Sequence, residues 1–228
     1  MLRVRLLLCG GFFGLCAAQA TSAATVTVTM TGTWSSVADT ACPAACVLDG
    51  SITVGSGFTA TFSYDDQIPD GDPLVGVGSY LMNGSAGTLS FTTGNYSFID
   101  QGVISNGLVI EDGVNGYDAV GLYFDRFLIS GSLPSGVALA PLAYANPTFD
   151  DFTKSALSSD RLTDVPWDVS LWNTKFYFFG PVTNRGTKDY IEFDGVISGL
   201  TVSVPEAGAG WLLGAAGIAL ALWRRANA

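Results

Sequence analysis

The 228-residue sequence contains no histidine. Without histidine, a chain cannot form a Ser-His-Asp triad, use a histidine general base or ligate a metal through imidazole. Any catalysis would depend on carboxylates, Tyr, Lys or Ser. The composition therefore excludes several common kinds of active site.

Basic residues are also scarce. The chain has 10 Lys and Arg against 20 Asp and Glu, and four of the ten lie close to the termini. Between residues 25 and 206, 6 basic and 20 acidic residues give a formal charge of −14. Such a surface repels nucleic acid and anionic lipid, whereas it suits solubility, cation binding or contact with neutral polymers. Nucleic acid is thus excluded as a partner.

The first 24 residues have the layout of a cleaved export signal. Arg3 and Arg5 form a basic region, and an apolar stretch covers residues 6–15. Ala18-Gln19-Ala20 supplies the small residues that a signal peptidase accepts, with Ser22-Ala23-Ala24 as a second choice. We expect export by the Sec machinery and removal of residues 1–24.

The other end of the chain reads as a membrane anchor. No residue from 207 to 223 is charged, and a helix of that length spans about 25 Å, just enough for a bilayer core of about 30 Å. Trp211 and Trp223 bracket the run, where indole rings favour the two interfaces. Arg224 and Arg225 follow it, so the positive-inside rule places the C-terminus in the cytoplasm. A buried helix of a globular domain is the alternative.

The motif Val204-Pro205-Glu206-Ala207 precedes this helix, and a basic tail, residues 224–228, follows it. Together, residues 204–228 resemble the PEP-CTERM sorting signal, whose family motif is Pro-Glu-Pro where this chain has Pro-Glu-Ala. The resemblance implies that an exosortase-like membrane protease recognises and cleaves the segment. It also implies transient anchoring in the inner membrane of a Gram-negative-type bacterium, followed by release to the cell surface or extracellular matrix.

Two cysteines, Cys42 and Cys46, remain after removal of the signal. Three residues separate them, whereas a redox motif has two, and a two-cysteine metal site without histidine is weak. In an oxidising compartment the pair predicts a local disulfide, which would stabilise a small surface loop by roughly 2 kcal/mol.

The region between the two signals, residues 25–203, is predicted to form one β-rich extracellular domain. Apolar and polar residues alternate at period two in many short segments, most clearly in Gly57–Tyr64, and glycine, of which the whole chain has 28, is frequent in the turns between them. The pattern predicts an all-β fold, an antiparallel sandwich or jelly roll. Strands are expected at residues 25–31, 51–54, 57–64, 77–82, 88–92, 96–99, 108–111, 119–130, 170–179 and 190–204, a loop at 33–50, a tight hairpin at 94–95 and one short helix at 150–160.

Two acidic groups are candidate sites. Asp65, Asp66, Asp70 and Asp72 lie within eight residues and offer the oxygen ligands that Ca²⁺ prefers, although Asp is equally typical of ordinary turns. The second group comprises Glu111, Asp112, Asp118 and Asp125. A glycosidase needs two carboxylates about 5 to 10 Å apart, and this group could supply them. Within it, Asp118 and Asp125 are seven residues apart, which predicts opposite faces of one strand.

Aromatic residues suggest a glycan platform. Trp34 and Trp172 are the principal candidates, with Trp167, Tyr177 and Tyr190 in addition, and Trp34 is expected to be the most exposed. A place in the core is the alternative for each of them.

The sequence as a whole favours an exported surface or extracellular-matrix protein without catalysis, structural or adhesive in an exopolysaccharide or biofilm matrix. No cofactor is expected, apart from the possible Ca²⁺. The main alternative is a secreted carbohydrate-binding or calcium-binding β module, and a glycoside hydrolase is the third possibility.

Overall fold

The computed structural model describes residues 24–40, 48–82, 86–101, 106–131, 144–183 and 189–204. These residues form eleven strands and two three-residue 3-10 helices, η2 (Leu162–Asp164) and η3 (Val169–Leu171). In this part of the chain no helix has the length and apolar character needed to cross a membrane. The strands are β1 (Thr25–Asp39), β2 (Gly57–Asp65), β3 (Val77–Leu81), β4 (Gly87–Thr93), β5 (Tyr96–Asp100), β6 (Gly107–Glu111), β7 (Asp118–Asp125), β8 (Phe127–Ser130), β9 (Tyr144–Asp151), β10 (Thr174–Thr183) and β11 (Tyr190–Ser203).

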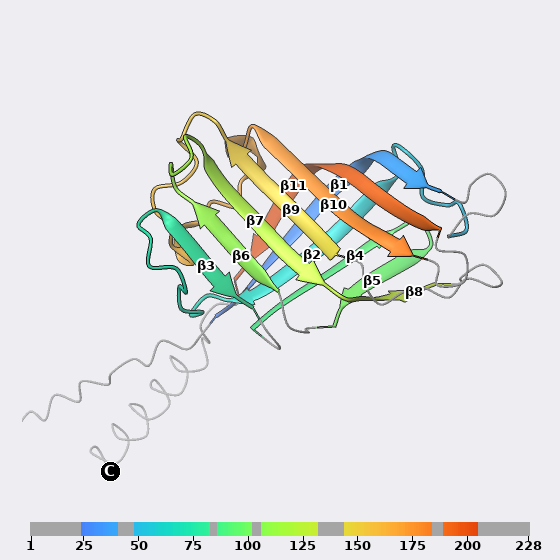
Figure 1. Ribbon diagram of the computed structural model, residues 1–228, viewed down its shortest axis with the longest axis horizontal. Coiled ribbons are helices and arrows are strands. Elements are labelled where there is room, and N and C mark those ends of the chain that lie inside the picture. Colours follow the sequence, from blue (N-terminus) through green and yellow to red (C-terminus); the bar gives the residue numbers. More distant parts are fainter. Residues whose placement is uncertain are drawn as a thin grey trace, which may run out of the picture.

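All eleven strands belong to one antiparallel sheet in the order β3-β6-β7-β9-β10-β11-β1-β2-β4-β5-β8. The sheet curls so that β7, β9 and β10 lie in the nearer half and β1, β2 and β4 in the farther half of Figure 1. Its inner face is therefore buried against itself. The all-β antiparallel prediction is confirmed, with a single curled sheet providing both halves.

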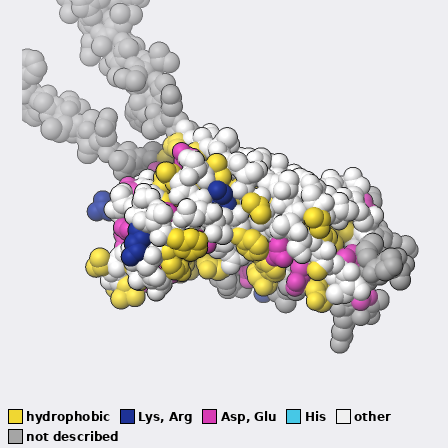
Figure 2. All heavy atoms as spheres, turned by 90° about the horizontal axis from the view of Figure 1, so that it is seen from above, with side chains coloured by type: hydrophobic (Ala, Val, Ile, Leu, Met, Phe, Trp, Pro, Cys, Tyr) yellow, Lys and Arg dark blue, Asp and Glu magenta, His cyan; other side chains and the backbone are white. Residues whose placement is uncertain are grey.

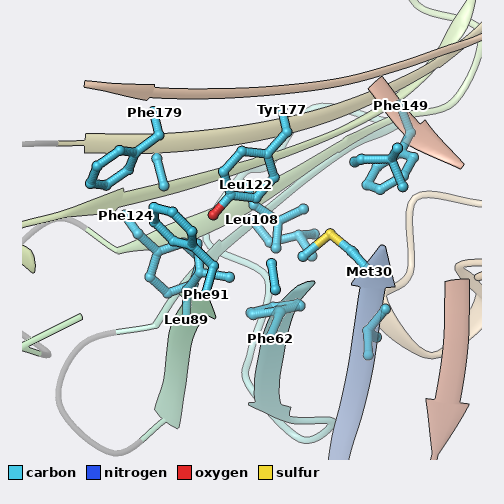
Figure 3. Packing of buried hydrophobic residues seen from close by; sticks show 14 of the residues in the cluster. Met30, Phe62, Leu89, Phe91, Leu108, Leu122, Phe124, Phe149, Tyr177 and Phe179 are labelled. Atoms are coloured by element: carbon cyan, nitrogen blue, oxygen red, sulfur yellow. The ribbon is translucent and has the colours of Figure 1, made fainter. Parts of the chain in front are cut away.

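Ring contacts across the curl show how closely the halves pack (Figure 3). The Phe91 ring of β4 lies 4.5 Å from Phe179 of β10, although three strands separate β4 from β10 in the sheet. The Phe62 ring of β2 lies 5.6 Å from Phe124 of β7. Each buried ring removes a large apolar area from water, and edge-to-face pairs add about 0.5–1.5 kcal/mol each.

Period-two alternation decides which side chains face this core. In β2 the side chains of Phe58, Ala60, Phe62 and Tyr64 are buried, and those between them point outward, as the sequence predicts. The hairpin at Gly94 is also confirmed: Thr93 pairs with Tyr96, and Gly94 has a φ of 54°.

Three predicted elements are wrong. Strand β1 continues through Asp39 because it pairs with β11 along its whole second half, so the loop predicted from residue 33 begins later. Residues 51–54 form no strand. The predicted helix at 150–160 is replaced by the end of β9 and a series of turns.

The segment predicted as one strand, residues 119–130, is interrupted at Arg126, which has a φ of 60°. Strand β7 pairs with β6 and β9, whereas β8 pairs with β5 at the opposite edge of the sheet. The chain therefore passes from one half of the curled sheet to the other at Arg126. The connections from β3 to β4 and from β5 to β6 cross between the halves as well.

The outer face of the farther half is rich in hydroxyl groups. Its cross-strand rows run Thr29–Thr61–Ser90 and Thr31–Thr59–Thr92 across β1, β2 and β4. In a third row, the Thr27 and Ser63 hydroxyls lie 2.9 Å apart. These short polar side chains project little from the sheet and are accessible to water.

One buried hydroxyl has no partner. Tyr177 is fully buried among aromatic rings (Figure 3), and its hydroxyl oxygen makes no hydrogen bond. Burial raises the pKa of the phenol well above its ordinary value. An unsatisfied buried hydroxyl destabilises the folded state, because the unfolded chain can hydrogen-bond the group to water.

We expect Tyr177→Phe to raise the free energy of unfolding by about 1 kcal/mol, since it removes only the unpaired hydroxyl. Tyr80→Phe is the matched control: the Tyr80 hydroxyl donates to the Asp160 carbonyl at 2.8 Å and accepts from the Leu162 amide at 3.1 Å. That control should lower stability by about 1–2 kcal/mol. Urea unfolding measures both, and a loss of stability in Tyr177→Phe would contradict the assignment.

Candidate functional site

The four aspartates predicted as a calcium site hold turns by local hydrogen bonds. Asp65 accepts from the Gln67 amide at 2.8 Å and Asp72 from the Leu74 amide at 2.9 Å. Asp70 accepts from the amides of Asp72 and Ser79, and Asp66 from the Ala24 amide. Among the described residues, no three His, Cys, Asp or Glu side chains converge on a position that could hold a metal ion. The geometry is that of turn chemistry.

The expected exposure of Trp34 is wrong. Only 1% of Trp34 and 2% of Trp172 is exposed, so neither indole can stack on a glycan. The Trp34 nitrogen donates to the Thr93 hydroxyl at 2.8 Å, and the ring contacts Phe58 and Phe193 in the core. The sequence misleads here because Trp34 stands beyond the predicted end of β1, where inward and outward positions could not be assigned.

Asp118 and Asp125 lie on opposite faces of β7, as predicted, and so cannot form a catalytic pair with each other. Asp118 is fully buried and accepts hydrogen bonds from the amides of Gly113 at 3.0 Å and Leu157 at 2.9 Å. Its role is to fasten two turns to the end of the sheet.

Asp151, the cross-strand partner of Asp118, organises the turn after β9. Its carboxylate accepts from the amides of Thr153, Ser155 and Ala156 and from the Thr153 and Ser155 hydroxyls. These hydrogen bonds, that of the Thr153 hydroxyl foremost, lower the pKa of Asp151 far below its ordinary value. A carboxylate that accepts several donors is strongly held in its ionised form.

Several predicted sites fall outside the described residues. These are the cysteines Cys42 and Cys46, the motif residues Pro205, Glu206 and Ala207, and the anchor residues Trp211, Trp223, Arg224 and Arg225. Val204, the last described residue, is 52% exposed directly after β11.

A different group of aromatic residues faces outward on the nearer half of the sheet. Tyr123 of β7, Tyr144 of β9, and Phe176 and Phe178 of β10 occupy outer positions on strands that are neighbours in the sheet. We call these four side chains the outer aromatic face. Figure 2 shows, from above, exposed hydrophobic side chains in separate patches, with few Lys and Arg.

One shallow groove of about 280 Å³ lies between β9 and β10, lined by Tyr144, Asn146, Thr148, Phe176 and Phe178. The rings of Tyr144 and Phe178 are 5.1 Å apart. The side-chain oxygen of Asn146 is buried and makes no hydrogen bond within the described structure. The groove thus combines aromatic walls with the polar side chains of Asn146 and Thr148.

A second hollow of about 150 Å³ lies over β6, β7 and β9. Ala119 and Gly121 form its floor. The Tyr123 ring lies over Gly121, and a Cβ atom added to Gly121 would be 3.4 Å from this ring. Glu111 and Asp150 stand on either side, since both pair with Ala119. We call this hollow the acid cleft; Thr148 lines it as well as the aromatic groove.

The two carboxylates of the acid cleft influence each other. Partial burial raises the pKa of Asp150, and the negative charge of Glu111 adds to the effect. The charge of Glu111 also raises the pKa of Tyr117, which lines the same cleft. No Lys or Arg is among the described residues that line either hollow. The negative charge of the cleft is therefore uncompensated.

The backbone explains why the hollows meet at Thr148. Strand β9 contains Pro147, which has no amide hydrogen to donate, and the pairing of β7 with β9 skips from Gly121↔Thr148 to Phe124↔Ala145. The ladder is interrupted at Tyr123 and Asn146, whose side chains contribute to the two hollows.

Sequence reasoning missed most of these residues; of the acid cleft it named only Glu111. One signal was present: four consecutive apolar residues, Phe176 to Phe179, cannot all face the core of a strand with period two, so two of them had to point outward. Tyr144 and Asp150 gave no such signal, because Pro147 concealed strand β9.

No protein-family model, no curated protein and no solved structure matches this chain. The chemistry of the outer face is therefore the basis for a functional assignment.

The hydrogen bonds of Asp151 predict a pH dependence of stability. Its pKa is lowered on folding, so the stabilisation is complete above the ordinary value of 3.8 and is lost as the pH falls below it. Asp151→Asn should lower the melting temperature near pH 7 and reduce its decrease between about pH 5 and pH 3. Asp72→Asn, which alters a carboxylate with a single turn contact, is the control. Equal acid sensitivity of Asp151→Asn and wild type would refute this role.

Proposed function

We propose that the protein is an exported, non-catalytic glycan-binding protein of the cell surface or extracellular matrix, and that it binds polysaccharide through the outer aromatic face. The observation that carries the proposal is the array of Tyr123, Tyr144, Phe176 and Phe178 on adjacent strands. Aromatic rings at outer positions of a sheet cost solvation and contribute nothing to the core. They are typical of a surface that contacts a ligand.

The chemistry of the groove fits a sugar chain. Tyr and Phe rings bury the apolar face of a pyranose, and the Tyr hydroxyls remain available for hydrogen bonds at the edge. The Thr148 hydroxyl lines the same groove beside the rings, where it can bond a sugar hydroxyl. The groove is shallow and open along the sheet, which suits an internal segment of a long polymer.

The proposed export and sorting rest on the terminal segments. Strand β1 begins at Thr25 and strand β11 ends at Ser203, so these two strands adjoin the terminal segments. Thr27 pairs with Ser203, so the two ends of the domain are neighbours. A C-terminal anchor read by an exosortase-like protease would leave the domain from the same end as the removed N-terminal signal.

We expect Tyr123→Ala and Phe178→Ala each to weaken polysaccharide binding about tenfold or more, because each removes a stacking ring. Affinity electrophoresis against a panel of exported bacterial polysaccharides and plant glucans provides the measurement. Leu128→Ala is the control, since Leu128 is 60% exposed on β8 at the other edge of the sheet.

The same panel tests the absence of catalysis. Binding that persists unchanged in both ring variants would place the ligand elsewhere and refute the assigned face. Release of shorter sugars during incubation would contradict a purely binding role.

For sorting, we expect intact-mass analysis of cell fractions to show a product that begins near Thr21 or Thr25 and ends near residues 205–207. This product should form only when the exosortase-like protease is present. Ala207→Pro restores the family motif and should increase the processed fraction, whereas Leu128→Ala should leave it unchanged. A full-length C-terminus retained in the membrane with the protease present would contradict the sorting proposal.

A further inference from the structure

The acid cleft has a charge pattern that a neutral sugar does not explain. Glu111 of β6 and Asp150 of β9 both pair with Ala119 of β7, so their Cα atoms are two strand spacings apart, roughly 10 Å. Both side chains lie at outer positions on either side of Ala119, and Tyr117, which hydrogen-bonds Glu111, lines the same cleft. The space above Ala119 is therefore bounded by a carboxylate on each side.

Among the described residues, no cation lies beside the carboxylates of the cleft. The described lining of the cleft contains no Lys or Arg, and the amide of Asn115, 3.0 Å from Glu111, is a neutral donor. Partial burial raises the pKa of Asp150, and the negative charge of Glu111 raises it further. Two unneutralised carboxylates in a partly enclosed hollow attract a positive charge.

The acid cleft is a poor coordination site for a hard metal ion. Ca²⁺ takes six to eight oxygen ligands. The described lining offers two carboxylates, the Thr148 hydroxyl and the phenol hydroxyls of Tyr117 and Tyr123, and among the described residues no three His, Cys, Asp or Glu side chains converge to hold a metal ion. An ammonium group has three donors in a compact arrangement, which matches Glu111, Asp150 and the Thr148 hydroxyl. Tyr117 and Tyr123 supply ring faces, which favour an organic cation over a hydrated metal ion.

Continuity with the aromatic groove identifies the kind of molecule that carries the ammonium group. Thr148 lines both hollows, so a ligand with its cation in the acid cleft extends directly onto the rings of Phe176 and Phe178. A free amine or an isolated lysine side chain would use only the cleft. A sugar chain with amine substituents would use both.

We propose that the outer face selects a polysaccharide bearing free, protonated amino groups, a partly or fully de-N-acetylated hexosamine polymer, and that Glu111 and Asp150 bind its ammonium groups. This inference rests on the proposed glycan-binding function and names its ligand class. The strongly acidic character of the domain, with a formal charge of −14 over residues 25–206, is complementary to such a polycation.

The test compares two ligands of equal length by isothermal titration calorimetry: a β-1,4-linked glucosamine hexamer and its fully N-acetylated counterpart. The solution is kept at a pH where the amines are protonated. The wild-type domain should bind the amine form about tenfold more tightly, because charge-assisted hydrogen bonds are the stronger kind. Added salt should weaken binding of the amine form and leave that of the N-acetylated form nearly unchanged.

The double variant Glu111→Gln, Asp150→Asn should bind both hexamers with affinities within about twofold of each other. Glu192→Gln is the matched control: it removes an acidic charge from an outer position of β11 that lines neither hollow, and it should keep the preference. Unchanged melting temperatures establish that the variants fold.

Failure of the inference and failure of the proposed function have different signatures. If the wild-type protein binds the two hexamers with equal affinity and Phe178→Ala loses that affinity, amine selectivity is overturned and glycan binding stays in place. An amine preference that survives in the double variant would overturn the roles of Glu111 and Asp150. No measurable affinity for the glucosamine hexamer would overturn the inference, and no affinity for any polysaccharide of the panel would overturn both.

Discussion

The burial of one sheet face against itself is the constraint on which the rest of this structure depends. Backbone hydrogen bonds join only neighbouring strands, so they fix the strand order but do not hold one half of the sheet against the other. Aromatic contacts do that: Trp34 of β1 packs on Tyr177 of β10 at 5.8 Å, and Phe127 of β8 on Phe179 of β10 at 5.2 Å. Every inner position is consumed by this packing, down to the unpaired Tyr177 hydroxyl. A binding surface must therefore come from outer positions.

The outer positions divide the molecule into two chemically different halves. On β1, β2 and β4 they carry Thr and Ser in aligned rows, whereas on β7, β9 and β10 they carry Tyr and Phe. Both halves bury an equally aromatic inner face, so the requirements of folding do not account for the difference. An antiparallel sheet tolerates polar outer residues on any strand. Outward-facing rings gathered on neighbouring strands support a role in ligand binding for this face.

How far the sequence predicts this molecule depends on how local each signal is. Strand β2 and the Gly94 hairpin are fixed by neighbouring residues, through alternation and a positive φ, and both are correct. Strand β9 is concealed by Pro147, which is tolerated because the ladder with β7 is interrupted there, a circumstance that exists only in the folded sheet. The burial of Trp34 likewise depends on β11 pairing with β1 as far as Asp39. The acid cleft is the least predictable feature, since Glu111 and Asp150 are brought together only by the strand order β6-β7-β9.

The strand order also makes anchoring and ligand binding compatible. The two ends of the domain leave from β1 and β11, which are neighbours near the middle of the sheet order. The hollows of the outer face are lined only from β6, β7, β9 and β10 and from Tyr117 beside β7. A C-terminal anchor would thus take none of the lining strands, and its removal would not expose or rebuild the site. A domain of this design would hold polysaccharide equally well while attached to the membrane and after release into a matrix, so sorting would decide where the protein acts without altering what it binds.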